Sequence, residues 1–340
     1  MGRYFLRIAT LFLFLYGSLY GNDGCCDQCQ FILRGEYLYF HPLIDQSYFV
    51  FEQDAPTTPA LAIGERHNNH GCYTSGFRVE GIFDYCPNEL DVRYTRFYHT
   101  PRRSFEAAGF LVPTKGASFF GNADNTNAKS HLHINFNEVE VLFLKLGFCC
   151  PCSINFRAGI NYTSIIFREE LFFTEPPTPF FTTIKQRTNF WGIGPEFDFN
   201  FLYPLSSIIP CWFDCIPICL AGDFRGGLLV SRSRAKFFEQ DNTAVFTTGV
   251  SIDARNDPIY RLVPFWDMRF GFAYECNICC FGLNLEIGYE FLSFHRAIQE
   301  IFFTNSGTSP TVVTFNNELS FDLYSNLDFH GLYVALGIVF

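Results

Sequence analysis

Apolar and polar residues alternate with a period of two along several long stretches of this chain. In the stretch 191–203, one face carries Trp191, Phe197 and Phe199, and the other face carries Glu196 and Asp198. The same split recurs in 154–162, 262–275 and 281–291. A period of two places successive side chains on opposite faces of a β-strand. Strands of about 9–11 residues are long enough to cross a membrane at a tilt, so the pattern predicts transmembrane β-strands.

A soluble β-sandwich or a lipocalin-like barrel is the alternative, and its apolar face would point inward. Two features favour the membrane barrel. The alternating stretches exceed the usual length of about 5–6 residues for a strand, and their polar faces combine Gly and Asn with closely spaced acids and bases, as a polar lumen would. The composition agrees, because 19% of the residues are aromatic while only 17% are charged.

Short and long connections alternate along the chain. Tight connections fall at 86–88, 149–152 and 276–279, and a longer one, 204–217, belongs with them. The intervening segments are long and polar, at 43–74, 101–134, 168–186, 235–259 and 296–326. Short periplasmic turns and long extracellular loops are typical of bacterial outer-membrane barrels. The predicted fold is therefore all-β, a transmembrane antiparallel up-and-down β-barrel of about ten strands, with 12–14 possible if hairpins form inside the loops. The ten strands are predicted at residues 31–42, 75–86, 88–100, 135–148, 153–167, 188–203, 218–233, 260–275, 280–295 and 327–340.

The first residues resemble an export signal. Arg3 and Arg7 precede an apolar run at 8–16, which is too short to span a bilayer because spanning takes about 20 apolar residues. Asn22 stands where a lipoprotein signal would need Leu before Cys25, so lipidation is not expected. The predicted organisation is a signal peptide at 1–21, a periplasmic amino-terminal segment at 22–30 and an outer-membrane barrel at 31–340.

The chain contains 14 cysteines, and all except Cys72 fall in the amino-terminal segment or at the connections assigned to the periplasm. Pairs spaced as in Cys26–Cys29 could bind zinc, but an oxidising compartment favours disulfides, so no metal and no cofactor is expected. These thiols could join turns of one chain, or join the barrel to other copies or to other envelope proteins. The disulfide candidates are Cys25, Cys26, Cys29, Cys86, Cys149, Cys150, Cys152, Cys211, Cys215, Cys219, Cys276, Cys279 and Cys280.

Acidic and basic residues recur two positions apart on the predicted inward face, in five pairs: Arg34 with Glu36, Arg78 with Glu80, Asp91 with Arg93, Asp223 with Arg225 and Asp267 with Arg269. They could form an electrostatic lining that selects small solutes, or ion pairs that fill the barrel. Ten strands leave a narrow pore at best, since about eight strands are just filled by their own side chains. The predicted pore-lining residues are Arg34, Glu36, Arg78, Glu80, Asp91, Arg93, Arg157, Glu196, Asp198, Asp223, Arg225, Asp267, Arg269, Glu286 and Glu290.

The formal net charge is −10, and loss of two arginines with the signal makes it −12, which argues against nucleic acid as a partner. At the other end, alternating apolar residues run from Leu332 to a terminal Phe340. This Phe is the expected assembly signal, read by the barrel-assembly machinery before the strand meets outer-membrane lipid.

Four stretches carry a family resemblance: 156–160, 191–195, 266–270 and 331–340. They resemble the Legionella-type major outer-membrane, pore-forming proteins, in matching order over most of the chain from about Phe77 onward. The resemblance implies an outer-membrane porin with no enzymatic residues to carry over. The cysteine density departs from that pattern and is closer to the envelopes of chlamydia-like bacteria, where disulfide-linked outer-membrane proteins give rigidity.

Three classes of function fit the sequence. A porin is favoured by the resemblance and the polar inner faces, and a non-conducting structural or adhesive protein is favoured by the thiols and the long loops. An outer-membrane enzyme would need an acid/base set converging at the outer rim, and no spacing singles one out. The sequence therefore predicts a non-enzymatic, porin-like protein with a narrow, polar-lined pore that contributes to a disulfide-linked envelope.

Overall fold

The computed structural model describes residues 30–45, 48–53, 65–69, 71–85, 88–106, 110–115, 126–150, 152–174, 181–207, 218–242, 250–278, 281–303 and 320–340. The predicted signal peptide and nearly all of the predicted amino-terminal segment lie outside these residues. Among the residues described, no helix has the length and apolar character needed to cross a membrane.

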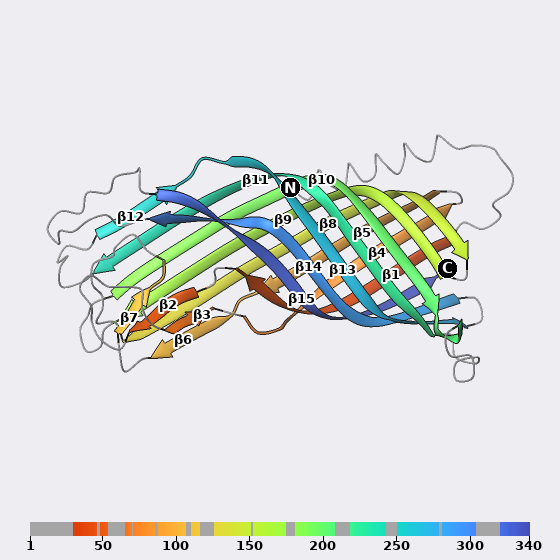
Figure 1. The fold of residues 1–340 in the computed structure, drawn as a ribbon, viewed down its shortest axis with the longest axis horizontal. Coiled ribbons are helices and arrows are strands. Elements are labelled where there is room, and N and C mark those ends of the chain that lie inside the picture. Colours follow the sequence, from red (N-terminus) through yellow and green to blue (C-terminus); the bar gives the residue numbers. More distant parts are fainter. Residues whose placement is uncertain are drawn as a thin grey trace.

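Ten long antiparallel strands form a closed barrel, as the sequence predicts (Figure 1). The first barrel strand pairs with the last along 13 registered positions, from Ile32 opposite Val339 to Ile44 opposite Leu327, which closes the wall. The barrel strands are β1 (Gln30–Ile44), β4 (Thr74–Tyr85), β5 (Asn88–His99), β8 (Asn127–Cys150), β9 (Cys152–Thr174), β10 (Phe181–Pro204), β11 (Ile218–Asn242), β13 (Ile259–Ile278), β14 (Phe281–Phe303) and β15 (Ser320–Val339).

The outward face of the barrel carries an apolar belt bounded by aromatic rings. At the end that holds the carboxyl terminus, the Phe340 ring lies 6.2 Å from that of Phe31 and 5.7 Å from that of Phe281. At the other border, the ring of Tyr73 lies 5.2 Å from the ring of Tyr39. Nine residues of β1 separate Phe31 from Tyr39, counting both, which matches the about 9–11 residues that a strand needs to cross the bilayer.

Several strands continue well beyond this belt, and the predicted boundaries are wrong there. β8 and β10 each contain 24 residues, and most of the segment 168–186, expected to be a long loop, belongs to β9 and β10. Above the belt, the inward side chains of β8 become apolar, as in Ile134 and Phe136, and outward ones become polar, as in His133. Lipid head groups and water replace acyl chains outside the wall at this level, so the outward side chains of the strand become polar and the inward ones apolar. A strand recognised by its apolar outer face therefore appears to end too early.

Within the described residues, five further strands lie in the connections, and three of them form a separate small sheet. They are β2 (Tyr48–Gln53), β3 (Glu65–Asn68), β6 (Arg102–Glu106), β7 (Phe110–Pro113) and β12 (Val250–Arg255). The sheet of β3, β2 and β7 lies at the end of the barrel opposite the carboxyl terminus (Figure 1). Phe49, Val50 and Leu111 of this sheet are buried in one cluster with inward residues of the barrel wall, including Phe173 and Phe237. We call the sheet of β3, β2 and β7 the plug sheet.

Candidate functional site: the barrel interior

The interior at the level of the apolar belt is a layer of buried charged side chains. They project from β1, β4, β5, β8, β9, β10, β11, β13 and β14, because the belt residues face outward and their neighbours along each strand face inward. The predicted pore-lining residues that take part in ion pairs in this layer are Arg34, Glu36, Arg78, Glu80, Asp91, Arg93, Arg157, Asp198, Arg225, Asp267, Arg269, Glu286 and Glu290.

On one side of the layer, Arg78 is the central cation. Its Nη1 atom lies 2.9 Å from Oε2 of Glu36, and its Nε donates to Thr95 Oγ1 at 2.8 Å. Arg269 of β13 also contacts Glu36, at 3.0 Å, and lies 3.3 Å from Glu290. Glu36 therefore accepts hydrogen bonds from two guanidinium groups, a charge-assisted arrangement of the strong kind.

On the other side, Arg93, Arg157 and Arg225 bind the remaining acids. Arg93 Nη1 donates to Glu140 Oε2 at 2.8 Å, and Arg157 Nη2 donates to Asp198 Oδ2 at 2.6 Å. Arg225 of β11 donates to Glu140 across the lumen and to Asp267 of the neighbouring strand. The two sides join through Arg34, which lies 3.1 Å from Glu36 and 3.8 Å from Glu80. The result is one network of ion pairs across the lumen.

The ion-pair partners of these charged residues are mostly different from those expected from the sequence. Of the five pairs spaced two apart, Arg34–Glu36 and Asp91–Arg93 make contact, at 3.1 and 3.5 Å. The expected pairs Arg78–Glu80, Asp223–Arg225 and Asp267–Arg269 are replaced, among the described residues, by contacts with other strands. Side chains two positions apart on one strand point the same way but lie roughly 7 Å apart. Charged groups on neighbouring strands or on the opposite wall can approach each other directly.

Two predicted residues stand apart from this network. Glu196 is buried, with 3% of its surface exposed, and neither of its carboxylate oxygens has a hydrogen-bond partner among the described residues. Asp223 lines a cavity of about 800 Å³ at the end of the barrel nearest the carboxyl terminus. Glu89, Lys145 and Arg157 also line this cavity, together with apolar residues such as Ile82 and Leu202.

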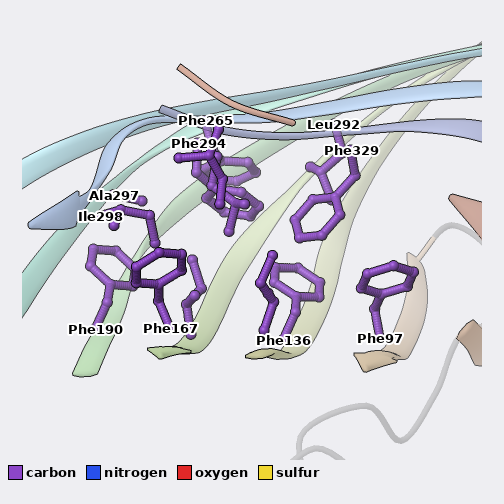
Figure 2. Packing of buried hydrophobic residues seen from close by; sticks show 14 of the residues in the cluster. Phe97, Phe136, Phe167, Phe190, Phe265, Leu292, Phe294, Ala297, Ile298 and Phe329 are labelled. Carbon is purple, nitrogen blue, oxygen red and sulfur yellow. The ribbon is translucent and has the colours of Figure 1, made fainter. Parts of the chain in front are cut away.

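Above the charged layer, inward aromatic and aliphatic side chains close the lumen. Phe136 of β8 lies 5.5 Å from Phe294 of β14 and 5.1 Å from Phe329 of β15, ring centre to ring centre. β8 is next to neither β14 nor β15 in the wall, so the ring of Phe136 meets the other two across the interior (Figure 2). Phe97 joins them at 5.2 Å from Phe329. The charged layer therefore occupies only the belt level, and the part of the lumen above it is apolar. We call these residues the aromatic layer.

Beyond the aromatic layer, the segment that follows β7 inserts a lysine into the barrel mouth. Lys115 Nζ lies 2.8 Å from Glu169 Oε2 and 2.9 Å from Glu300 Oε1, and 3% of the Lys115 side chain is exposed. Burial alone would lower the pKa of Lys115, but the two carboxylates outweigh it and hold this pKa above its usual value. Burial raises the pKa of Glu300, and the ammonium of Lys115 opposes that rise. This pairing fixes the segment after β7, residues 114–115, which we call the plug segment, to β9 and β14 of the wall.

The cysteines are described only in part. Cys219 and Cys276 carry free thiols in this structure, and so does Cys72 at the opposite end. For Cys149, Cys150 and Cys152 the strand positions are described but not the side chains, and the remaining candidates lie outside the described residues. Disulfide formation stays a prediction for all of them. Phe340 is half exposed at the rim, where its backbone pairs with Phe31 at 2.9 and 3.4 Å.

Sequence reasoning did not single out several members of the interior. Glu138 and Glu140 alternate with Val139 and Val141 and could have been assigned inward from that pattern. Lys115 carried no such signal, because it lies in an irregular segment far in sequence from Glu169 and Glu300. Its role follows only from how the loop folds back into the barrel.

An antiparallel barrel with an apolar outer belt and a charged interior is an integral outer-membrane β-barrel. The chain belongs to the family of the Legionella pneumophila major outer membrane protein precursor, whose family model matches residues 25–340. The protein is therefore a bacterial outer-membrane protein, and the family resemblance noted in the sequence is confirmed. The comparison with curated proteins finds no match to this chain.

Two solved structures show the general likeness in fold. The outer membrane protease OmpT from Escherichia coli is 8% identical, with a TM-score of 0.44, over 94% of this chain and 99% of the protease. A Pseudomonas aeruginosa FadL homologue is 10% identical, with a TM-score of 0.29, over 92% of this chain and 90% of that protein. Both scores are below 0.5, so the fold rests on the strand pairing and the family match.

Proposed function

We propose that this protein is a non-enzymatic, porin-like barrel that passes small polar solutes through a narrow, charged lumen, closed in the present conformation by the aromatic layer. The cavity of about 800 Å³, with charged side chains in its lining, forms one vestibule of this path. The charged layer is its selective section, because rings of charged side chains discriminate among solutes. The aromatic layer is its gate, because apolar constrictions exclude water.

One observation carries the proposal: buried polar atoms of the charged layer are left without partners among the described residues. Both oxygens of Glu196, Oδ1 of Asp198 and Oδ1 of Asp91 have none. Buried polar groups in proteins are nearly always satisfied by protein or by ordered water, which supports the proposal that water enters the lumen at this level. A barrel with only a structural role would not need the charges, because apolar side chains of similar volume fill an interior at equal or lower free energy.

The test is conductance across a planar lipid bilayer that contains the refolded full-length protein. The double variant Phe136→Ala/Phe329→Ala removes two rings that meet across the lumen. We expect rare, small current steps for the original protein and frequent, larger steps for the double variant. Phe199→Ala, which removes an outward ring of the belt, is the matched control and should leave the steps unchanged.

A second candidate is a non-conducting wall protein. The aromatic layer and the plug sheet favour it, because together with the charged layer they fill the lumen in the described part of the barrel. Silence of both the original protein and the Phe136→Ala/Phe329→Ala variant, with both correctly folded, would establish this second candidate and overturn the pore. Under either function, cysteines at the periplasmic rim would link copies of the barrel, or link it to other envelope proteins, in an oxidising compartment.

A further inference from the structure

The outer wall carries a row of basic side chains at one level, on five strands that lie next to one another. The register places His133 of β8 opposite Arg168 of β9, and Arg168 opposite Arg187 of β10. It then places Arg187 opposite Lys236 of β11, and Lys236 opposite Arg255 of β12. All five side chains share the outward face of their strands and are exposed or half-buried. We call them the basic row.

The positive charges of the basic row repel one another and by themselves destabilise this part of the wall. Directly opposed side chains on neighbouring strands lie about 4.5–5.5 Å apart at Cβ, and like charges there destabilise the sheet. None of the five forms an ion pair with any residue that the structure describes, and Arg187 donates only to the amide oxygen of Asn189, at 3.1 Å. Partial burial and the charge of Arg168 lower the pKa of Arg187. Partial burial and the same arginine also lower the pKa of His133. An external anion would relieve this repulsion.

The position of the basic row on the barrel indicates which kind of anion would bind to it. Trp191, an exposed ring of the belt, lies opposite Arg232, whose guanidinium is 5.9 Å from the centre of the Tyr260 ring. Aromatic rings of this kind mark the border between acyl chains and head groups. Arg187 lies four residues beyond Trp191 on β10, about 13 Å along a strand that rises roughly 3.3 Å per residue. With a strand tilt of about 35–45°, the basic row lies roughly 10 Å above the border, at the level of lipid head groups.

A pocket on the outer surface continues the row away from the membrane. Its volume is about 320 Å³, and Arg102, Lys129 and His131 line it together with one acid, Glu170. Glu170 lies 3.7 Å from Lys185. His131 and Glu170 are each two residues along their strands from members of the basic row. The row and the pocket therefore form one continuous, mainly basic surface directly above the apolar belt.

We propose that this surface binds a phosphate-bearing lipid of the outer leaflet. Its phosphates would contact Arg168, Arg187 and Lys236, its polar head group would extend into the pocket, and its acyl chains would lie against the belt below. Arginine suits this role because the planar guanidinium donates two parallel hydrogen bonds to a phosphate. The belt beneath the row favours a lipid over a soluble anion, since one ligand then contacts both surfaces.

The test uses the refolded full-length protein in a neutral detergent, with binding measured by native mass spectrometry. The probes are a diphosphorylated lipid A, the same lipid without its phosphates, and inorganic phosphate. We expect the diphosphorylated lipid to bind at least about tenfold more tightly than the other two, because charge-assisted contacts to phosphate are the strong ones. Equal binding of the lipid without phosphates, or equally tight binding of inorganic phosphate, would overturn the proposal.

Variants then locate the site. Arg168→Gln/Arg187→Gln/Lys236→Gln should lose about tenfold or more in affinity for the diphosphorylated lipid. Arg66→Gln, which removes an exposed charge from the plug sheet, is the control and should stay near the original affinity. Unchanged affinity of a folded triple variant would refute the assignment. If the triple variant does not fold, Arg187→Gln alone, at the centre of the row, must show the weaker binding.

Discussion

Arg78 and Glu290, which are 212 residues apart in sequence, join through two parallel hydrogen bonds of 2.9 and 2.6 Å inside the barrel. Both side chains are fully buried. Arg78 projects from β4 and Glu290 from β14, and between these strands in the wall lie β1 and β15. The pair therefore connects the two sides of the seam at which the first and last strands close the barrel.

Removing the cation of this pair should destabilise the barrel strongly. Arg78→Met leaves Glu290 and Glu36 buried with less positive charge, and we expect a loss of about 3–5 kcal/mol in the free energy of unfolding. Arg96→Met on the neighbouring strand removes an outward, exposed charge and should cost far less. Urea unfolding of the protein in lipid vesicles measures both values. A cost for Arg78→Met no larger than that for Arg96→Met would show that the pair does not support the seam.

The orientation of β10 gives a second prediction. Phe199 is exposed on the belt, whereas Asn200 faces the lumen, where it accepts a hydrogen bond from Asn155 at 3.1 Å. Phe199→Arg should cost about 2–4 kcal/mol, because it places a charge in the acyl chains. Asn200→Arg should be much milder, since its side chain enters the charged cavity. Equal costs in the same unfolding experiment would contradict the assigned inside and outside of this strand.

The plug sheet should depend on Lys115. Lys115→Met leaves Glu169 and Glu300 facing each other without the cation, so we expect residues 110–115 to become accessible to protease while the barrel remains intact. In the original protein, the raised pKa of Lys115 keeps its stabilising charge fully present below the ordinary lysine pKa of about 10.4, and it is lost only as the pH rises through the raised value. Resistance to protease should therefore not change between about pH 6 and pH 9 on account of this lysine. Cleavage of both proteins at equal rates would exclude this role.

The cysteines at the periplasmic rim should form disulfides in the cell envelope. Non-reducing electrophoresis of envelopes is expected to show high-mass species that collapse to the monomer with reductant, because pairs form and persist in this compartment. Intrachain pairs would each stabilise the barrel by about 2–4 kcal/mol. Cys276→Ala should reduce the high-mass species more than Cys72→Ala, since Cys72 lies at the opposite end of the barrel. A single monomer band without reductant would count against the network.

The register of cross-strand pairs limits what can be read from the sequence inside the lumen. Alternation assigns Arg78 and Asp267 to the inward face, because neighbours on a strand point to opposite sides. It does not say that Arg78 binds Glu36 and Glu290, or that Asp267 binds Arg225. Those partners depend on which strands are adjacent and by how many residues they are offset, and a contact across the interior depends on the width of the closed barrel.

By itself, the sequence determined the all-β class, the ten barrel strands, the outward apolar belt and the family. These features follow from a local period of two and from the order of turns along the chain. Only the tertiary structure decided that the lumen is closed by Phe136 and its partners, that Lys115 fixes the plug segment, and that five basic residues on separate strands form one row. The physical reason is that each strand must present apolar side chains to lipid, so its outward face can be recognised from its own sequence. Contacts across the lumen and along the wall join residues far apart in the chain, and they exist only once the barrel has closed.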